Sequence, residues 1–253
     1  MPDFKAMVLE LLKSIETGDT KPLAYINPQK YIQHNPNVAD GLDGFKELLA
    51  TRKAGAAKVA TLRIFQDGDF VLAHSEYHLA VPMIGFDVFR FEDGKIVEHW
   101  DNKQEKASSL SPSGHSMTDG PCMATDLEKT ESNKALMRRY MDDLLQGRKE
   151  TFSSYFDGIN YIQHSPLVAD NLTGLFAGLQ ELATKGLAVK YRKVHRIIGE
   201  GNFVLVMAEG SFGETATAYY DFYRIQDGKI AEHWDTLESI PPVSLSKNLN
   251  GKF

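Results

Sequence analysis

The chain of 253 residues has 42% hydrophobic and 25% charged residues, as an ordinary globular protein has, which excludes collagen and long disorder. Its 28 basic and 34 acidic residues give a net charge of −6, which disfavours general binding to nucleic acid or to an anionic membrane. The single cysteine, Cys122, excludes an intrachain disulfide and the cysteine-based zinc motifs. No apolar run reaches the roughly 18 residues that a membrane span needs.

In chain order, the first element predicted is an amphipathic helix. Apolar residues lie at helical spacing from Phe4 to Ile15, and Gly18 follows as a C-terminal stop. The segment has no basic region followed by an apolar core and a cleavage site, so it is not a signal peptide. The expected location is therefore the cytoplasm.

The next elements predict an α+β domain. A short helix at Phe45–Leu49 follows the segment YIQHNP, and alternating residues after it predict strands. The pair Asp93-Gly94 lies between apolar runs, which is typical of a hairpin turn. Helices followed by a curved antiparallel sheet form a domain with its helices packed on one face of the sheet.

The whole pattern then recurs. YIQHNPNVAD at 31–40 returns as YIQHSPLVAD at 161–170, and FDVFRFEDGKIVEHWD at 86–101 returns as YDFYRIQDGKIAEHWD at 220–235. The copies are far longer than solenoid units of about 20–50 residues. The sequence therefore predicts two homologous domains in tandem.

The expected boundaries follow from composition. The first domain spans 1–105 and the second spans 127–242. The stretch 106–126 is rich in Ser, Pro and Gly and is expected to be a linker, in which Cys122 is an incidental thiol. Residues 243–253 form a C-terminal tail.

The last hairpin of each copy carries acidic and imidazole side chains, and its register decides which of them share a face. A three-residue loop at 92–94 sets Asp87 opposite His99, with Asp101 on the same face. A two-residue turn slips the register by one residue and sets Asp87 against Trp100. The first register is favoured because it places oppositely charged side chains as neighbours and keeps the Arg90–Glu98 pair apart from the other acidic and imidazole groups.

This register places Arg90 and Glu98 on the other face, as a solvated ion pair. The second copy repeats the arrangement, with Arg224 and Glu232 on one face. Its remaining polar residues share the other face: Asp221, His233 and Asp235.

These acidic and imidazole groups are candidate catalytic residues. A carboxylate on an apolar wall has a raised pKa, and a nearby histidine titrates in the physiological range. Such a pair can remove a proton next to a carbonyl and return it elsewhere. The alternative interpretation is structural: the aspartates cap turns and the histidines are satisfied core residues.

A second group of residues is expected to bind the substrate. Tyr31 and His34, or Tyr161 and His164, would donate hydrogen bonds to a substrate oxygen, or else pack in the core. The other candidates for the pocket walls are His74, Trp100, Trp234 and Tyr223.

One strand raises the question of a metal. His74, Glu76 and His78 share a strand face and would form a metal site if they met His99 and Asp101. The second copy lacks both strand histidines, so such a site would exist in the first copy only. No metal is predicted. No cofactor is predicted either, since phosphate-loop and dinucleotide motifs are absent.

The repeated segments YIQHNP and FDVFRFEDGKIVEHWD also carry a family resemblance. Each copy resembles the SnoaL-like polyketide cyclase family of the nuclear transport factor two-like superfamily, closest to its predicted aldol condensation branch. The resemblance implies cone-shaped domains that close a ring by intramolecular aldol condensation without metal or cofactor. It implies that Asp101 and Asp235 are the acid/base residues, aided by a nearby histidine, with Asp87 and Asp221 at the partner position.

The expected function is a cofactor-independent lyase or isomerase that acts on a small hydrophobic carbonyl compound in each cone. The alternative is a non-catalytic small-molecule-binding module of the same fold, and a third possibility is that one copy alone is catalytic. Members of the superfamily pair through their sheets, so the two repeats are expected to form an intrachain pseudo-dimer, with further homo-oligomers possible. No nucleic acid or membrane partner is expected.

Overall fold

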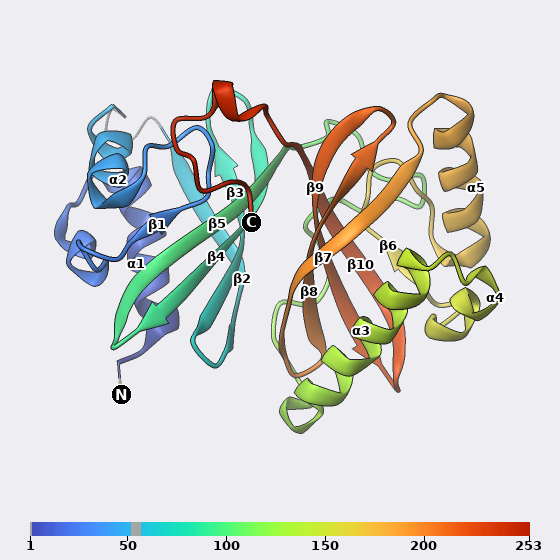
Figure 1. Ribbon diagram of the computed structural model, residues 1–253. Helices are drawn as coiled ribbons and strands as arrows, with labels where there is room; N and C mark the ends of the chain where they lie inside the picture. Colours follow the sequence, from blue (N-terminus) through green and yellow to red (C-terminus); the bar gives the residue numbers. More distant parts are fainter. Residues whose placement is uncertain (1, 52–56) are drawn as a thin grey trace. The chain divides into compact units, whose positions relative to one another are not determined.

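The computed structural model describes residues 2–51 and 57–253, and the chain divides into two compact units (Figure 1). Unit 1 comprises Met1–Glu105 and Pro241–Phe253, and unit 2 comprises Lys106–Ile240. Each unit is an α+β domain, as predicted, and contains one five-stranded sheet. No helix in the described ranges is both long and apolar enough to cross a membrane.

Unit 1 begins with helix α1 (Phe4–Thr17). The Asp3 side chain accepts a hydrogen bond from the Ala6 N–H at its start, and Gly18 ends it with a left-handed φ of 72°. The remaining elements are a 3₁₀ turn (Lys21–Tyr25), β1 (Ile32–Gln33), α2 (Gly41–Ala50), β2 (Lys58–Asp67), β3 (Phe70–His78), β4 (Met83–Glu92), β5 (Lys95–Glu105) and, near the C-terminus, a 3₁₀ turn (Val243–Leu245).

Unit 2 repeats this order after the 3₁₀ turn Leu127–Lys129. Its elements are α3 (Thr130–Leu145), α4 (Lys149–Phe152), a 3₁₀ turn (Ser153–Tyr155), β6 (Ile162–Gln163), α5 (Asn171–Thr184), β7 (Val189–Glu200), β8 (Phe203–Phe212), β9 (Thr215–Gln226) and β10 (Lys229–Ser239).

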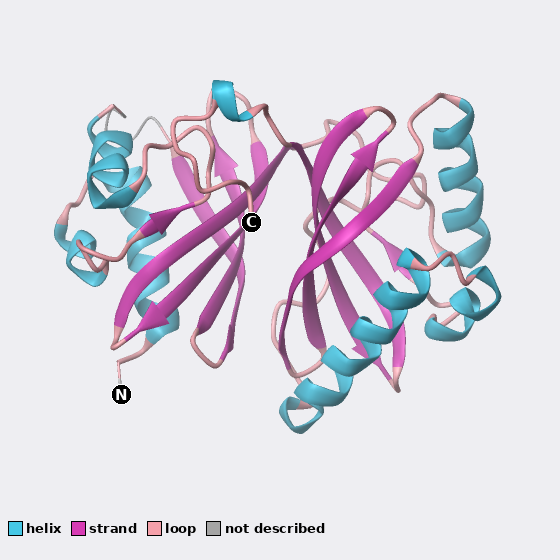
Figure 2. Cartoon of the chain, viewed as in Figure 1, coloured by secondary structure: helices cyan, strands magenta, loops and turns pink. Residues whose placement is uncertain are grey.

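The two sheets have the same topology. Their strand orders are β1-β5-β4-β3-β2 and β6-β10-β9-β8-β7, and all neighbours are antiparallel except the short first strand of each. That strand, which contains the Ile-Gln of the YIQH repeat, pairs in parallel with the last strand. Within each unit the helices cover one face of its sheet (Figure 2), with α1 on β2 and β3, and α3 on β7 and β8. A hydrophobic core fills the space between these layers.

The β4–β5 hairpin differs from the predicted three-residue loop. Asp93 and Gly94 both have positive φ, 50° and 75°, so they form a two-residue turn in which Glu92 pairs with Lys95. A bulge follows, because Arg90 pairs with Glu98 while Phe91 pairs with Ile96. The predicted loop and register are therefore wrong.

The bulge decides which side chains share a face. Asp87 pairs with Asp101, while His99 pairs with Phe89, so Asp87 does not lie opposite His99. The extra residue compensates for the shorter turn, and the three polar groups still share one face. Unit 2 has the same bulge and pairs Asp221 with Asp235.

Candidate functional site

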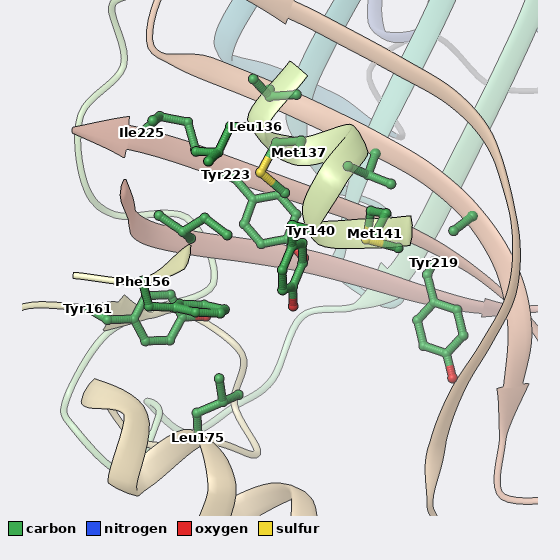
Figure 3. Packing of buried hydrophobic residues seen from close by; sticks show 14 of the residues in the cluster. Leu136, Met137, Tyr140, Met141, Phe156, Tyr161, Leu175, Tyr219, Tyr223 and Ile225 are labelled. Carbon is green, nitrogen blue, oxygen red and sulfur yellow. The ribbon is translucent and has the colours of Figure 1, made fainter. Parts of the chain in front are cut away.

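A cavity of about 510 Å³ lies in unit 2 between the sheet and helices α3 and α5. Figure 3 shows the rings of Tyr140, Tyr161 and Tyr223 within the buried cluster that forms part of its wall. The volume falls in the range of small-molecule sites, about 300–1,000 Å³. The polar residues of the cavity lining include Gln163, Asp221, His233 and Asp235, and Ser165, Lys190 and Arg192 also contribute to it.

A continuous chain of hydrogen bonds connects these polar groups. The hydroxyl of Tyr191 donates to both Asp221 oxygens at 3.0 Å, and Asp221 Oδ1 lies 3.1 Å from His233 Nε2. The other ring nitrogen, Nδ1, lies 3.0 Å from Gln163 Oε1, and Gln163 Nε2 donates to the hydroxyl oxygen of Tyr161 at 3.0 Å. The relay therefore runs across the sheet face from β7 to β6.

The orientation of Gln163 fixes the tautomer of His233. The backbone N–H of Ser165 donates to Gln163 Oε1 at 2.9 Å, so this oxygen is an acceptor and His233 Nδ1 must carry a hydrogen. His233 Nε2 then faces a carboxylate oxygen of Asp221 at 3.1 Å. The imidazole is therefore held between Gln163 and Asp221 in one orientation.

Asp235 is the carboxylate that the cavity exposes. It is only partly buried, whereas Asp221 is 1% exposed. Burial, reinforced by the neighbouring Asp221, raises the pKa of Asp235 to about 6, although His233 and a hydrogen bond from Ser165 act against the shift. A carboxyl group with this pKa exchanges protons readily near neutral pH.

Tyrosine hydroxyls surround the carboxylates. Burial first, and the charge of Asp221 in addition, raise the pKa values of Tyr191 and Tyr223 well above 10. Burial also raises the pKa of Tyr161. These phenols therefore stay protonated and act as hydrogen-bond donors on the cavity wall.

Unit 1 contains the same relay. Tyr77 donates to Asp87, whose Oδ1 lies 3.0 Å from His99 Nε2, and His99 Nδ1 lies 3.0 Å from Gln33 Oε1. Gln33 donates in turn to the Tyr31 hydroxyl at 3.1 Å. The tyrosine beside the aspartate comes from β3 in unit 1 and from β7 in unit 2, so the position is filled from different strands.

The two units differ at the last aspartate. Asp101 is 2% exposed and forms an ion pair with Lys103, while the ammonium of Lys252 lies 3.8 Å from its Oδ1. Burial alone would raise the pKa of Asp101, but Lys103 and Lys252 outweigh it and hold the pKa well below its ordinary value. Asp101 is therefore a fixed anion, whereas Asp235 titrates.

Sequence differences explain this contrast. With the offset of the repeat, Lys103 corresponds to Leu237, which lines the cavity of unit 2. Lys252 comes from the C-terminal residues 247–253, which we call the tail strap. Asn248 in this strap donates to the carbonyl oxygens of Asn35 and Val38 at 2.7 and 2.9 Å.

Residues 111–120, the linker strap, occupy the corresponding place in unit 2. His34 Nδ1 contacts the Gly251 carbonyl oxygen at 3.0 Å, and His164 Nδ1 contacts the Ser116 carbonyl oxygen at 3.0 Å. The residue after each carbonyl is Lys252 in the tail strap and Met117 in the linker strap. Both lysines near Asp101 thus have apolar counterparts in unit 2.

Several residues predicted to bind substrate lie on the other face of the sheet. Trp234 alternates along β10 with Asp235, so its side chain points away from the cavity. His164 stacks on Trp234 with 4.5 Å between ring centroids, and its Nε2 lies 2.8 Å from Glu232. The prediction that His164 and Trp234 line the pocket is wrong. Glu232 is 2% exposed and also binds Arg224 at 2.6 Å, so this ion pair is buried, not solvated as predicted.

The same correction applies to unit 1. His34 stacks on Trp100 with 4.9 Å between ring centroids, on the face opposite to Asp101. His74 lies on this face as well, stacked on Phe86 at 4.2 Å, because alternation along β3 turns it away from the side that carries Asp87. Their predicted place in the pocket wall is therefore wrong.

Alternation also separates the strand histidines from the proposed metal partners. His74, Glu76 and His78 lie on one face, whereas His99 and Asp101 lie on the other. Among the described residues, three clusters bring ligating atoms within 4.8 Å of one another: Asp87, His99 and Asp101; Asp221, His233 and Asp235; and His115, Asp119 and His164. In the first two, hydrogen bonds to a glutamine and an aspartate already engage the ring nitrogens.

Sequence reasoning missed Gln33 and Gln163, which orient the two histidines, although the letters YIQH recur in both copies. Lys103, Lys252 and Tyr191 were missed as well. Lys252 and Tyr191 occupy segments without a matching residue in the other copy, so the repeat gave no signal for them.

Residues 8–99 match the model of the SnoaL-like domain, which confirms the resemblance for the first copy. No curated protein matches the chain.

Solved structures similar to the chain each match about two fifths of it. IdmH, a candidate polyketide cyclase from Streptomyces antibioticus, is 19% identical over 39% of this chain and 90% of its own, with a TM-score of 0.34. TsrD from Streptomyces laurentii is 22% identical over 41% and 92%, with a TM-score of 0.34. A candidate ketosteroid isomerase from Kribbella flavida is 20% identical over 45% and 84%, with a TM-score of 0.36.

Proposed function

We propose that unit 2 is a cofactor-independent lyase or isomerase that transfers a proton on a small hydrophobic carbonyl compound. The observation that carries the proposal is Asp235: a partly exposed carboxyl group in a cavity of about 510 Å³, beside the His233–Asp221 pair. The aromatic and aliphatic wall favours an apolar ligand, and the phenol of Tyr161 supplies a donor for its carbonyl oxygen.

In the proposed reaction, the carboxylate of Asp235 takes a proton from the carbon next to the carbonyl. The C–H electrons form a C=C bond, the carbonyl π electrons move to oxygen, and the Tyr161 hydroxyl stabilises the resulting enolate. Asp235 then returns the proton at the same or another carbon. The carboxylate of Asp221, which lies 3.1 Å from His233 and is paired with Asp235 across the hairpin, supports the raised pKa of Asp235.

Unit 1 has a structural role in this proposal. Its corresponding carboxylate, Asp101, is bound by Lys103 and Lys252 and is not available as a base at neutral pH. We therefore propose one catalytic site per chain, in unit 2.

The second candidate is a binding module without catalysis. One observation favours it: unit 1 keeps the complete Tyr-Gln-His-Asp relay around an aspartate that is already ion-paired, so the relay has a structural use. In that case the unit 2 cavity holds a ligand and its acidic groups only orient it.

Exchange of α-protons distinguishes the two candidates. The probe is 2-tetralone in D₂O, followed by ¹H NMR, with Asp235→Asn as the test variant and Asp101→Asn as the matched control. We expect Asp235→Asn to lower the catalysed exchange by about 10²–10⁴-fold and Asp101→Asn to retain it. Catalysed exchange should rise with pH through about 6, because Asp235 must be ionised to act as a base. Binding without exchange, or equal rates in wild type and Asp235→Asn, would contradict the catalytic proposal.

A further inference from the structure

A cluster on the opposite face of the unit 2 sheet from the cavity has the composition of a metal site. His115 and Asp119 come from the linker strap, and His164 follows β6. Asp119 bridges the histidines: its Oδ2 lies 3.2 Å from His115 Nδ1, and its Oδ1 lies 2.8 Å from His164 Nδ1. Ligands about 2.0–2.1 Å from a tetrahedral zinc ion lie roughly 3.3 Å apart. The ligating atoms of the three residues all lie within 4.8 Å of one another, so inward movement of the side chains would enclose an ion.

The surrounding groups match the second sphere of a zinc site. The remaining ring nitrogen of His164, Nε2, lies 2.8 Å from the Glu232 carboxylate, and that of His115 lies 3.2 Å from the Asp170 carboxylate. Histidines that bind metals usually donate their other N–H to a carboxylate, which fixes the tautomer and makes the ligand more basic. Both histidines therefore present Nδ1 to the same point.

The charge at the cluster favours a divalent cation. Three carboxylates, those of Asp119, Asp170 and Glu232, meet two imidazoles and one guanidinium, that of Arg224, whose Nε lies 2.6 Å from Glu232. With neutral imidazoles the sum is −3 + 1 = −2. Either two protons or one divalent cation neutralise this charge, and the His₂-carboxylate donor set is one that Zn²⁺ prefers.

The internal repeat offers a comparison. His34 contacts the carbonyl oxygen of Gly251 in the tail strap, and the residue before Gly251 is Asn250. Asn250 therefore corresponds to His115. It donates to Asp40 at 2.7 Å, just as His115 contacts Asp170 in unit 2. An amide in place of an imidazole is a poor zinc ligand. The cluster of ligating groups is thus specific to the linker strap of unit 2.

We propose that His115, Asp119 and His164 bind one Zn²⁺, with a water molecule or the Ser116 carbonyl completing the tetrahedron. The ion attaches the linker strap to the sheet of unit 2. The site is separate from the cavity and its chemistry, since Glu232 and His164 lie on the opposite face from Asp235.

The test uses the full chain, freed of metal with a chelator and titrated with Co²⁺ and then Zn²⁺. We expect a visible absorption band of tetrahedral Co²⁺ at one ion per chain, abolished by Zn²⁺. Binding should also change the fluorescence of Trp234, whose indole N–H donates to the Asp119 carbonyl oxygen at 2.9 Å and whose ring stacks on His164. A Trp100→Phe background leaves Trp234 as the sole tryptophan.

Variants locate the ion. His115→Ala and Asp119→Asn each change a partly or fully exposed side chain, so the fold should persist, and each should abolish binding. Asp170→Asn should weaken it by about 10–100-fold, as loss of a carboxylate behind a ligating histidine does. Asn250→Ala is the matched control and should bind like the wild type. Absence of Co²⁺ and Zn²⁺ binding, or binding that survives His115→Ala but is lost in Asp235→Asn, would overturn the proposal.

Discussion

At the scale of single residues, identical side chains in corresponding positions have different properties because of their neighbours. Asp101 and Asp235 each lie beside a Tyr-Gln-His-Asp relay, because each is paired across the hairpin with the aspartate of that relay. Two ammonium groups lower the pKa of Asp101, whereas burial and the neighbouring carboxylate of Asp221 raise the pKa of Asp235 to about 6. The motif alone therefore does not determine whether the carboxylate can act as a base.

Leu237 is the residue that keeps the cavity of unit 2 apolar where unit 1 has Lys103. Leu237→Lys should place an ammonium beside Asp235, lower its pKa and fill part of the cavity. We expect catalysed 2-tetralone exchange to fall by at least about tenfold, while Leu237→Met, which conserves volume and polarity, retains it. Unchanged exchange in Leu237→Lys would show that this position does not control the base.

The raised pKa of Asp235 also has a cost in stability. A carboxyl group whose pKa is higher in the folded state stabilises the fold while protonated, and this contribution is lost as the pH rises through the folded-state value. Asp235→Asn should therefore raise the free energy of unfolding at pH 8 by up to about 3 kcal/mol, and by much less near pH 4.5. Urea unfolding at both values measures the difference.

Asp101→Asn is the control for this measurement and should act in the opposite direction. Removing its charge takes the Asp101 carboxylate from Lys103 and Lys252, although Asp87 remains 3.7 Å from Lys103, and loss of a buried pair costs up to about 3–5 kcal/mol. If Asp235→Asn destabilised the protein at pH 8 as Asp101→Asn does, its carboxylate would have a structural role.

At the scale of elements, the hairpins show how far the sequence could be read. Asp93-Gly94 identified the turn, but the number of loop residues and the bulge beyond it depend on packing of the two strands. The turn is one residue shorter than predicted, and the bulge adds one residue to β5. The two changes keep the alternation of side chains the same, so the prediction that Asp87, His99 and Asp101 share one face is confirmed although the predicted register is wrong. The alternation of side chains along a strand turns Trp100 away from that face, and His34 stacks on Trp100 there.

The straps are elements that no periodicity could predict. Each is irregular chain held by side-chain hydrogen bonds to the turn after the YIQH segment. Asn248→Ala removes two donors from the Asn35 and Val38 carbonyls and should cost about 1–3 kcal/mol of local stability. Hydrogen exchange should increase in residues 31–40 and 247–253, while exchange in β7–β10 stays unchanged. Equal protection in both proteins would mean that other contacts hold the tail strap.

At the scale of the whole molecule, the repeat made the fold predictable, because the same order of helices and strands had to satisfy both copies. The α+β class, the SnoaL-like domain and the helix-covered sheets follow from motifs and periodicity. The different charge environments of Asp101 and Asp235 could not be predicted in this way. They depend on Lys252, which is about 150 residues from Asp101 in the chain and only 3.8 Å from it in the fold. The two units thus share one sheet topology, while the charges beside Asp101 and Asp235 differ.

Titration of the aspartate carboxyls by ¹³C NMR tests this divergence most directly, with the signals of Asp101 and Asp235 assigned by their Asn variants. We predict that Asp235 titrates with a midpoint near 6 and that Asp101 stays ionised down to the lowest pH at which the protein remains folded. An Asp235 midpoint at the ordinary value near 4, or an Asp101 that titrates near neutral pH, would contradict the assignment of proton transfer to unit 2.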